Sequence, residues 1–555
     1  MLLPWAVWRI AACAAFADII KQKRRQIDDL LGLRKQLSFF MVFKRSELSA
    51  RQLDIMALLA TILAPSMVFM VSTALSVALP AIQRDLQASG TDLIWIVNAY
   101  SLLQAAFIFI SGSFGDHFGR RRFYIIGIVI FSLASFVCGT TQSANMLILA
   151  RAAQGMGSGM MITCSLAIVA VHFAHHRRSW SIGVWSAFTM LISGAGPILG
   201  GWLTELGLWR LIFLVNLLLG PLAIAVLLLY VQESYDDEAP AELDMTGTIL
   251  STLTLLLAGF FFIEGPRRGF DDPAVLLAGA GAIIILPAFV WIEGHSDHPM
   301  MPLNLFRSRT FTGANTLTLL LYGAINTVLF FLPLELIQVQ GYSESAVGIA
   351  LLPMTLMLVG VSFVINRVVD RYGPRLPLIC GPLVIGCAML ILSELEVTHG
   401  QDTYVQTLLP TMCLFGVGMG ITLAPLTTAV MASVNEHYAG LASGLNNTVS
   451  RSAQILAIAA MGSMAILVFQ NALLSDPLVL SLPDDARAFL LAESVRLAET
   501  PSPAGLSAQE DAALREGIRR SFSESIRSVM IISAALSIAA GMLASKLIEN
   551  ELPPE

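Results

Sequence analysis

The chain has 555 residues, of which 56% are hydrophobic and only 13% are charged, and its mean hydropathy is +0.73. A soluble domain carries about a quarter charged residues, so this composition excludes an ordinary soluble protein. The formal net charge of -6 decides little, because in a membrane protein the position of charge matters more than its sum.

The apolar residues form long runs separated by polar breaks, for example 125–137, 211–231 and 531–543. A helix needs roughly 20 apolar residues to cross about 30 Å of hydrocarbon. Continuous runs are also unlike the alternating pattern of a barrel strand. We therefore predict an all-α polytopic membrane protein with about fourteen spans, near 55–78, 93–115, 123–141, 146–170, 182–203, 210–231, 246–264, 274–292, 311–333, 346–369, 376–394, 406–430, 452–470 and 523–546.

Residues 1–50 precede the first predicted span and consist of an apolar start followed by the basic run 21–25. Charge after the apolar stretch is the reverse of a signal peptide. Two interpretations remain. The segment is a basic helix on an anionic membrane surface, or translation starts downstream, for example at Met41 or Met56.

Arginine is concentrated in the loops after spans two, four, eight and ten. The positive-inside rule then predicts a multi-pass protein of the cell inner membrane with both termini cytoplasmic. The same topology places the polar stretch 471–522 outside, with a surface amphipathic helix at 485–498. The arginines in question are Arg120, Arg121, Arg122, Arg177, Arg178, Arg307, Arg309, Arg371 and Arg375.

Residues 112–122, with the sequence Gly-Ser-Phe-Gly-Asp-His-Phe-Gly-Arg-Arg-Arg, join spans two and three. Glycines permit a tight turn and close helix contact. Asp116 is placed to pair with the arginines or to face the positive end of a helix. We predict a conformational gate here; the alternative is a solvated basic turn that only sets topology. The predicted gate residues are Gly112, Asp116, Gly119, Arg120 and Arg121.

A second copy of this pattern, residues 366–375, follows span ten and keeps the spacing of Asp370 and Gly373. Recurrence of one element in two halves is expected of a transporter built from repeats. In the second copy Asn366 replaces the leading glycine and Pro374 replaces an arginine. We therefore expect the first copy to matter more.

Polar side chains also occur inside the spans. Arg151 in span four is expected to face a cavity or a partner, or else to extend from near the helix end to the membrane surface. Asn98 and Gln104 in span two are candidates to line a substrate cavity; the alternative is that they only hydrogen-bond neighbouring helices.

Span five contains Gly196, Pro197, Gly200 and Gly201. Proline bends a helix, and glycines let a neighbour approach closely. A kinked packing helix without further function is the alternative interpretation.

These motifs resemble the major facilitator superfamily, and the resemblance covers about residues 50–550. The loop 112–122 resembles its signature loop. Arg151, followed by Gln154 and Gly155, resembles its second motif, whose arginine is implicated in proton transfer. The Gly-Pro-x-x-Gly-Gly sequence at 196–201 resembles its antiporter motif. The span count and residues 263–269 and 440–447 look like the fourteen-helix drug:proton antiporter branch.

The resemblance implies two pseudo-symmetric six-helix bundles, 51–231 and 311–550, with two inserted helices in 232–310. One departure matters. Where the branch has an aspartate in span one, this chain has Val71. Glu335 is a possible substitute carboxylate for proton coupling; the alternative is an ordinary outer-loop residue.

The implied function is secondary active export of small lipophilic compounds in exchange for protons. The implied partners are a small-molecule substrate, protons and the lipid bilayer; whether a periplasmic adaptor is needed stays open. The sequence carries no P-loop or hydrolase signature, so we expect no enzyme, cofactor, metal or nucleic-acid partner. The alternatives are a metabolite transporter or exchanger of the same fold, and a membrane sensor or scaffold that does not transport.

Overall fold

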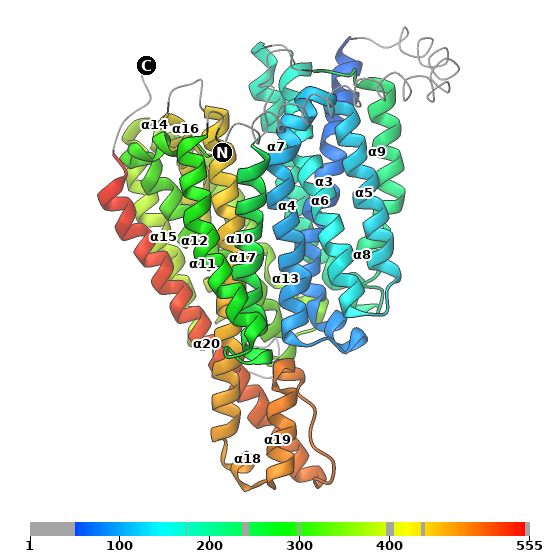
Figure 1. The fold of residues 1–555 in the computed structure, drawn as a ribbon, viewed down its shortest axis with the longest axis vertical. Coiled ribbons are helices and arrows are strands. Elements are labelled where there is room, and N and C mark those ends of the chain that lie inside the picture. Colours follow the sequence, from blue (N-terminus) through cyan, green and yellow to red (C-terminus); the bar gives the residue numbers. More distant parts are fainter. Residues whose placement is uncertain are drawn as a thin grey trace, which may run out of the picture.

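The computed structural model describes residues 50–173, 175–235, 244–296, 299, 301–395, 404–434 and 439–549. Both interpretations of the N-terminal extension concern residues that lie almost wholly outside these ranges. The described chain is built from helices (Figure 1). In the first part of the chain these are α3 (Ala50–Leu86), α4 (Gly90–Phe118), α5 (Arg120–Thr140), α6 (Ala144–His172), α7 (His175–Glu205), α8 (Leu211–Leu214), α9 (Asn216–Tyr230), α10 (Met245–Arg268) and α11 (Pro273–His295).

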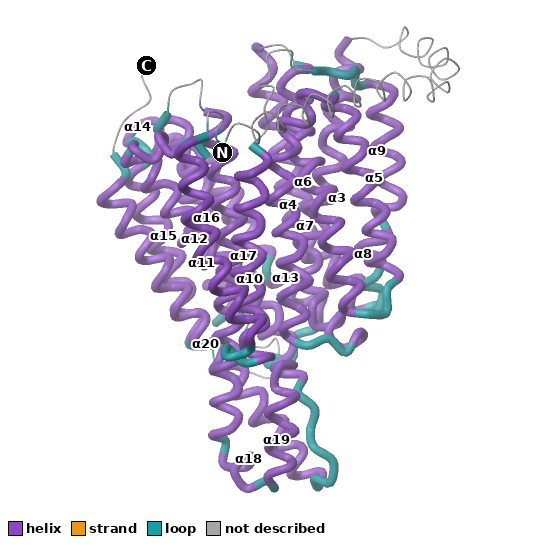
Figure 2. The backbone as a smooth tube through the Cα atoms, in the orientation of Figure 1, coloured by secondary structure: helices purple, strands orange, loops and turns teal. Residues whose placement is uncertain are grey.

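The second part of the chain is also helical. Its elements are η1 (Leu303–Arg307), α12 (Arg309–Gln338), α13 (Glu344–Ala350), α14 (Leu352–Tyr372), α15 (Arg375–Ser393), α16 (Leu408–Ala432), α17 (Ala439–Ser475), α18 (Pro477–Ser481), α19 (Asp484–Glu493), η3 (Ser494–Glu499) and α20 (Ala508–Leu547). The tube view in Figure 2 shows that short loops connect most of the long helices.

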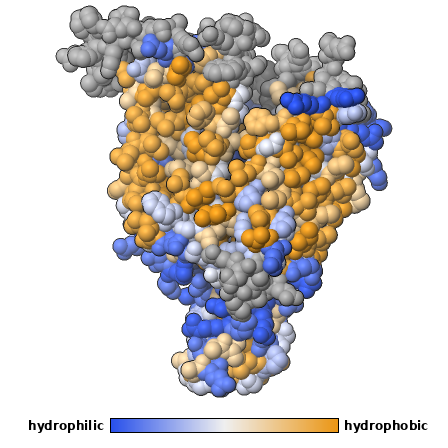
Figure 3. Space-filling model, turned by 180° about the vertical axis from the view of Figure 1, so that it is seen from behind, coloured by the Kyte–Doolittle hydropathy of each residue, from blue (hydrophilic) through white to orange (hydrophobic). Residues whose placement is uncertain are grey.

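Fourteen helices are long and apolar enough to cross a membrane, and each overlaps one of the predicted spans. The predicted fold class is therefore confirmed. The exposed face in Figure 3 carries a broad hydrophobic belt between hydrophilic ends, as expected for side chains that face lipid. Large apolar side chains such as Leu218 and Leu277 are about three-quarters exposed. A soluble protein would not tolerate such exposure over a wide area.

Several span boundaries were wrong. The thirteenth candidate span begins at Gly444 and not at 452, and the last helix begins at Ala508 and not at 523. Hydropathy marks only the lipid-embedded part of a helix, whereas α20 starts in polar sequence. There Ser507 and Glu510 form a capping box that satisfies the first backbone donors of the helix.

The helices form two groups with two inserted helices between them. Helices α3 to α9 pack against one another, as do α12 to α17 together with α20. The inserted pair α10 and α11 pack together, and α10 contacts both α4 and α17. In Figure 1 the two groups diverge toward the end where α3 begins and α20 ends.

Residues 471–522 form a helical projection at the opposite end of the bundle (Figure 1). It contains α18, α19 and η3, between the extended ends of α17 and α20. The predicted helix at 485–498 corresponds to α19 and η3, but it is more than a surface helix. Leu490 and Leu497 are buried, and η3 packs against α4, α17 and α20.

Candidate functional site

Arg151 lies in the interior of the bundle, only 1% exposed. Its Nε donates to the carbonyl of Ile96 on α4 at 3.2 Å, and its Nη1 donates to Oε1 of Gln154 one turn along α6. Gln154 in turn donates to Ser135 on α5 at 2.7 Å. The guanidinium therefore cross-links α4, α5 and α6. The alternative in which Arg151 extends to the membrane surface was wrong.

The guanidinium carbon of Arg151 also stands 3.9 Å from the ring centroid of Tyr100. A cation over an aromatic face is attracted by the ring, most strongly where water is absent. The Tyr100 hydroxyl accepts a hydrogen bond from Gln104 Nε2 at 3.2 Å, and the same nitrogen lies 3.0 Å from Ser158 Oγ on α6. This arrangement fixes the Tyr100 ring on the inner face of α4.

The two predicted cavity residues of α4 are both buried. Gln104 bonds within its own group of helices, to Tyr100 and Ser158. Asn98 donates across to the other group, to the carbonyl of Ile455 on α17 at 3.3 Å. Each amide also has an oxygen with no hydrogen-bond partner among the described residues. Both therefore bond neighbouring helices, and both keep a free acceptor.

Arg451 was not among the predicted site residues. It lies on α17, donates Nη1 to Gln454 at 3.2 Å, and interacts electrostatically with Tyr100 of α4 and Tyr322 of α12. The predicted thirteenth span began one residue after it, so Arg451 was assigned to a loop. The available signal was Arg-Ser-Ala-Gln at 451–454, which matches the Arg-Ala-Ala-Gln at 151–154.

We call Tyr100, Arg151, Tyr322 and Arg451 the central polar cluster. No acidic residue accompanies it in sequence, because aspartate and glutamate are absent from 93–115, 120–204, 310–334 and 439–475. These ranges contain the membrane-embedded parts of α4, α5, α6, α7, α12 and α17. The cluster is therefore positively charged.

Glu335 lies away from this cluster, near the projection end of α12. It is 3% exposed, and its Oε1 accepts from Ser523 of α20 at 3.1 Å and from Gln340 at 3.4 Å. Its second oxygen has no partner among the described residues. The alternative of an ordinary loop residue was wrong about its location, because the side chain is buried between two helices.

At the junction of α4 and α5, Gly119 has a φ of 104°, a conformation that favours glycine. A Cβ there would stand 2.7 Å from the carboxyl carbon of Glu233. Glu233 Oε1 accepts from the backbone N–H of Arg121 at 2.8 Å, and Oε2 from that of Arg122 at 3.1 Å. Glu233 thus caps α5 at its positive end.

The other gate residues are only partly described. Arg120 is 8% exposed, and its N–H donates to the carbonyl of Ser234 at 3.1 Å. The side chain of Asp116 and the surroundings of Gly112 lie outside what the structure describes, and so does the side chain of Asp370. Gly373 ends α14 with a φ of 78°. Gly119 and Gly373 therefore occupy matching helix ends in the two copies of the motif.

The Gly-Pro segment of α7 lies between the two groups of helices. Gly196 and Gly200 face α3; a Cβ on Gly200 would stand 2.5 Å from the carbonyl oxygen of Ala74. Gly201 abuts the backbone of Glu344 at the start of α13, and Gly348 of α13 abuts the Pro197 carbonyl. Backbone meets backbone on both sides of this stretch, as small residues allow between membrane helices.

Polar contacts also join the two groups of helices near the Gly-Pro segment of α7. Arg84 of α3 pairs with Glu344 at 2.5 Å, and Gln338 donates to Gln83 at 2.8 Å. The projection takes part as well, since Gln83 donates to the Arg496 carbonyl at 2.9 Å and Arg496 donates to Gln87 at 3.3 Å. The described contacts of this set all lie toward the projection end of the bundle.

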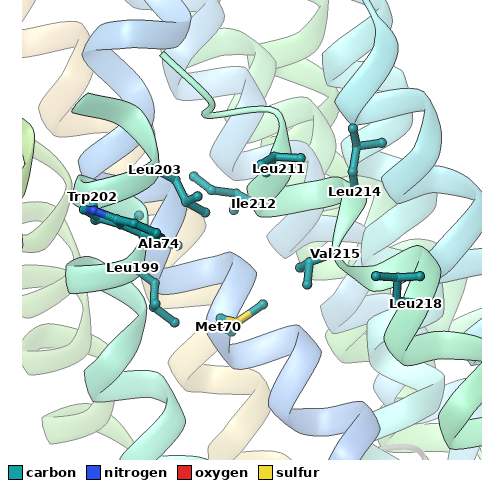
Figure 4. Close-up of a pocket in the computed structure, with 11 residues that line it drawn as sticks. Met70, Ala74, Leu199, Trp202, Leu203, Leu211, Ile212, Leu214, Val215 and Leu218 are labelled. Atoms are coloured by element: carbon teal, nitrogen blue, oxygen red, sulfur yellow. The ribbon is translucent and has the colours of Figure 1, made fainter. Parts of the chain in front are cut away.

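An apolar groove of about 470 Å³ opens on the outer surface between α3, α7, α8 and α9 (Figure 4). Its walls include Met70, Leu199 and Leu203, and Trp202 and Leu218 at its rim are more than half exposed. The groove carries almost no polar atoms, which suits hydrocarbon chains and offers nothing for chemistry.

Comparisons with known proteins agree with this geometry. A sequence model of the Major Facilitator Superfamily matches residues 61–458. The "Multidrug resistance protein Stp" of Mycobacterium tuberculosis (strain CDC 1551 / Oshkosh) is 33% identical over 445 residues, 80% of this chain and 81% of Stp. The "Tetracenomycin C resistance and export protein" of Streptomyces glaucescens is 28% identical over 491 residues, 88% of this chain and 90% of that protein.

Among solved structures, this chain is similar to a bacterial homologue of the human lysosomal transporter Spinster in an inward-facing, unoccupied conformation. The TM-score is 0.62, and the match covers 90% of this chain and 99% of that chain. The sequence identity is only 16%, so this likeness concerns the fold.

Proposed function

Because this chain belongs to the major facilitator superfamily, we propose that it is a secondary active transporter that exports small lipophilic compounds in exchange for protons. Relatives named for multidrug resistance and for tetracenomycin C resistance and export support the direction of transport. The division into bundles 51–231 and 311–550, with inserted helices in 232–310, is part of this proposal.

The observation that carries the proposal is the packing of the Gly-Pro segment of α7 between α3 and α13. A transporter that exposes one site alternately to two sides needs an interface that closes tightly and then separates. Glycine faces make such an interface, because they bring backbones together without interlocking side chains. The ion pair of Arg84 with Glu344 is exposed on the arginine side, so separating it costs little.

We place the protein in the cell inner membrane with both termini cytoplasmic, which puts the projection outside. In this orientation the described conformation is closed toward the outside, and its two groups of helices diverge toward the cytoplasm (Figure 1). The gate at 112–122 then lies on the cytoplasmic side. Glu233 holds the start of α5 there through its bonds to Arg121 and Arg122.

Proton coupling requires a group that changes protonation as the conformation changes. Glu335 is our candidate, because it is buried between α12 and α20 and has one unpartnered oxygen. Arg151 is assigned to coupling as well, since it links α4 to α6 beside the contact with α17. A lipophilic substrate needs few polar contacts, which fits the apolar spans around this cluster.

A transport assay in everted membrane vesicles tests the proposal. Vesicles that contain the protein are expected to accumulate a lipophilic dye when a proton gradient is imposed, and a protonophore is expected to abolish the accumulation. A susceptibility panel on a deletion strain, complemented with the original chain or with Asp116→Asn, identifies the compounds. Accumulation that persists unchanged without a proton gradient would refute the coupling, and flux only in the opposite direction would refute export.

A further inference from the structure

We propose that the central polar cluster binds the acidic group of an anionic substrate, of the class of lipophilic carboxylates, and that Arg451 is the residue that selects for it. The inference deepens the proposed transport function and rests on it. It concerns the charge of the substrate, which neither the fold nor the relatives specify.

The packing of α4 against α17 places Arg451 opposite Tyr100. The two helices run in opposite directions, with Gly462 against Ile94 and the Ile455 carbonyl accepting from Asn98. Arg451 precedes Ile455 by about one helical turn. Because the helices are antiparallel, one turn back along α17 from Ile455 corresponds to moving forward along α4 from Asn98, toward Tyr100. Tyr100 of α4 and Tyr322 of α12 lie within electrostatic range of Arg451, in agreement with its place at the contact between α4 and α17.

The two arginines of the cluster differ in how many of their N–H donors remain available to a ligand. Arg151 is buried and is held by Ile96, Gln154 and the Tyr100 ring. Arg451 is partly exposed, and its one hydrogen bond within the described structure goes to Gln454 on its own helix. A guanidinium has five N–H donors. Most donors of Arg451 are therefore free to meet a ligand.

The tyrosines add donors of the same kind. The Tyr100 hydroxyl accepts from Gln104, and its own hydrogen has no acceptor among the described residues. The Tyr322 hydroxyl has no hydrogen-bond partner within the same residues, and its side chain is partly exposed. The cluster thus offers O–H and N–H donors around a fixed positive charge.

A charge at this depth of a membrane protein needs a partner of opposite sign or a well-hydrated cavity. The chain provides no acidic residue in the neighbouring stretches of α4, α6, α12 and α17. A carboxylate ligand supplies the missing acceptor, and guanidinium recognises it with two parallel hydrogen bonds. A cationic ligand would instead add charge of the same sign.

The test measures binding to the purified full-length protein in nanodiscs with three probes that share one fluorophore. Dansylglycine is an anion, dansylglycinamide is neutral and dansylcadaverine is a cation. Dansylglycine is expected to bind with a Kd at least about tenfold lower than the other two, as for one charge-assisted hydrogen bond. Empty nanodiscs correct for partition into lipid.

Substitutions test whether Arg451 is responsible for the preference for the anionic probe. Arg451→Gln is expected to remove the preference for dansylglycine while leaving dansylglycinamide binding unchanged, which also shows that the variant is folded. Arg451→Lys is expected to keep part of the preference for dansylglycine. Arg527→Gln is the matched control, because it removes an arginine that pairs with Glu394 on the exposed surface at 2.7 Å; it is expected to behave as the original chain does.

Three results would overturn the inference: dansylcadaverine binding as tightly as dansylglycine, no dansylglycine binding at all, or an anion preference that survives Arg451→Gln. Flux of dansylglycine into proteoliposomes separates the two proposals. Selective binding without flux contradicts the transport function and supports the site. Flux of dansylcadaverine without any preference for the anion supports transport and contradicts the site.

Discussion

The carboxylate of Glu233 accepts a hydrogen bond from the backbone N–H of Arg121 at 2.8 Å, although 112 positions separate the two residues. The bond ties the segment after α9 to the first turn of α5. A carboxylate at a helix N-terminus is stabilised by the free N–H groups and by the helix dipole. The loop that joins α4 to α5 is thereby anchored to another part of the same bundle.

Replacing Glu233 tests this anchor. Glu233→Gln keeps the shape and removes the charge, so we expect a loss of about 0.3–1 kcal/mol of stability and a several-fold loss of transport in everted vesicles. Thermal unfolding in detergent measures the first effect. Glu394→Gln removes an exposed carboxylate that pairs with Arg527 and should change neither quantity. Transport by Glu233→Gln equal to that of the original chain would contradict a role in gating.

Gly201→Ala tests the glycine interface. An added methyl group would collide with the Glu344 carbonyl across the two halves, so the state closed at the projection end should become less favourable. We expect increased labelling of a cysteine introduced at position 84 by a membrane-impermeant maleimide, together with slower transport. Gly360→Ala is the control, since a Cβ at Gly360 meets nothing within 4 Å. Identical labelling of the two variants would show that α13 does not close on α7.

Arg151→Lys separates charge from geometry. Lysine keeps the charge but lacks the planar group that stacks on Tyr100 and donates to both Ile96 and Gln154. We expect at least about a tenfold loss of proton-driven transport, while helix content stays unchanged by circular dichroism. Recovery of full activity with lysine would mean that only the positive charge matters at this position.

Glu335→Gln tests the proposed proton carrier. Glutamine can still accept from Ser523 and Gln340, as Oε1 of the carboxylate does, but it cannot exchange a proton. We expect substrate exchange across proteoliposomes at equal pH to continue, whereas accumulation against a gradient is lost. Glu493→Gln in the projection is the control for removal of a carboxylate. If Glu335→Gln still accumulates substrate, the coupling group lies elsewhere.

The spans were predictable because each is encoded locally, by about one helix length of apolar residues. The burial of Arg151 was predictable for the same reason, since a charge within such a run must find partners. Arg451 was missed because hydropathy placed the edge of its span at residue 452, one residue past Arg451, whereas the span begins at Gly444. The small and polar residues within 439–451 lowered the local hydropathy, yet the helix continues through them.

Other features depend on contacts between distant parts of the chain. Glu233 stands in a polar linker, and nothing local indicates that it meets the start of α5. The burial of Glu335 arises only when α20 packs against α12 and brings Ser523 to it. In the projection, the helix at 485–498 was predicted from its amphipathic pattern, but the extension of α20 was not, because it lies beyond the apolar span and its start is defined by the capping residue Ser507.

The length of α20 also means that a small rotation in the membrane produces a large displacement in the projection. Helix α20 is continuous over 40 residues, about 60 Å, and runs from the far end of the bundle into the projection. A tilt of the whole helix by about 10° about its C-terminal end would therefore displace its N-terminal tip, in the projection, by roughly 10 Å. A fluorophore attached near α18 would convert a small rotation inside the lipid into a large displacement in water, where the working cycle of single molecules can be followed optically.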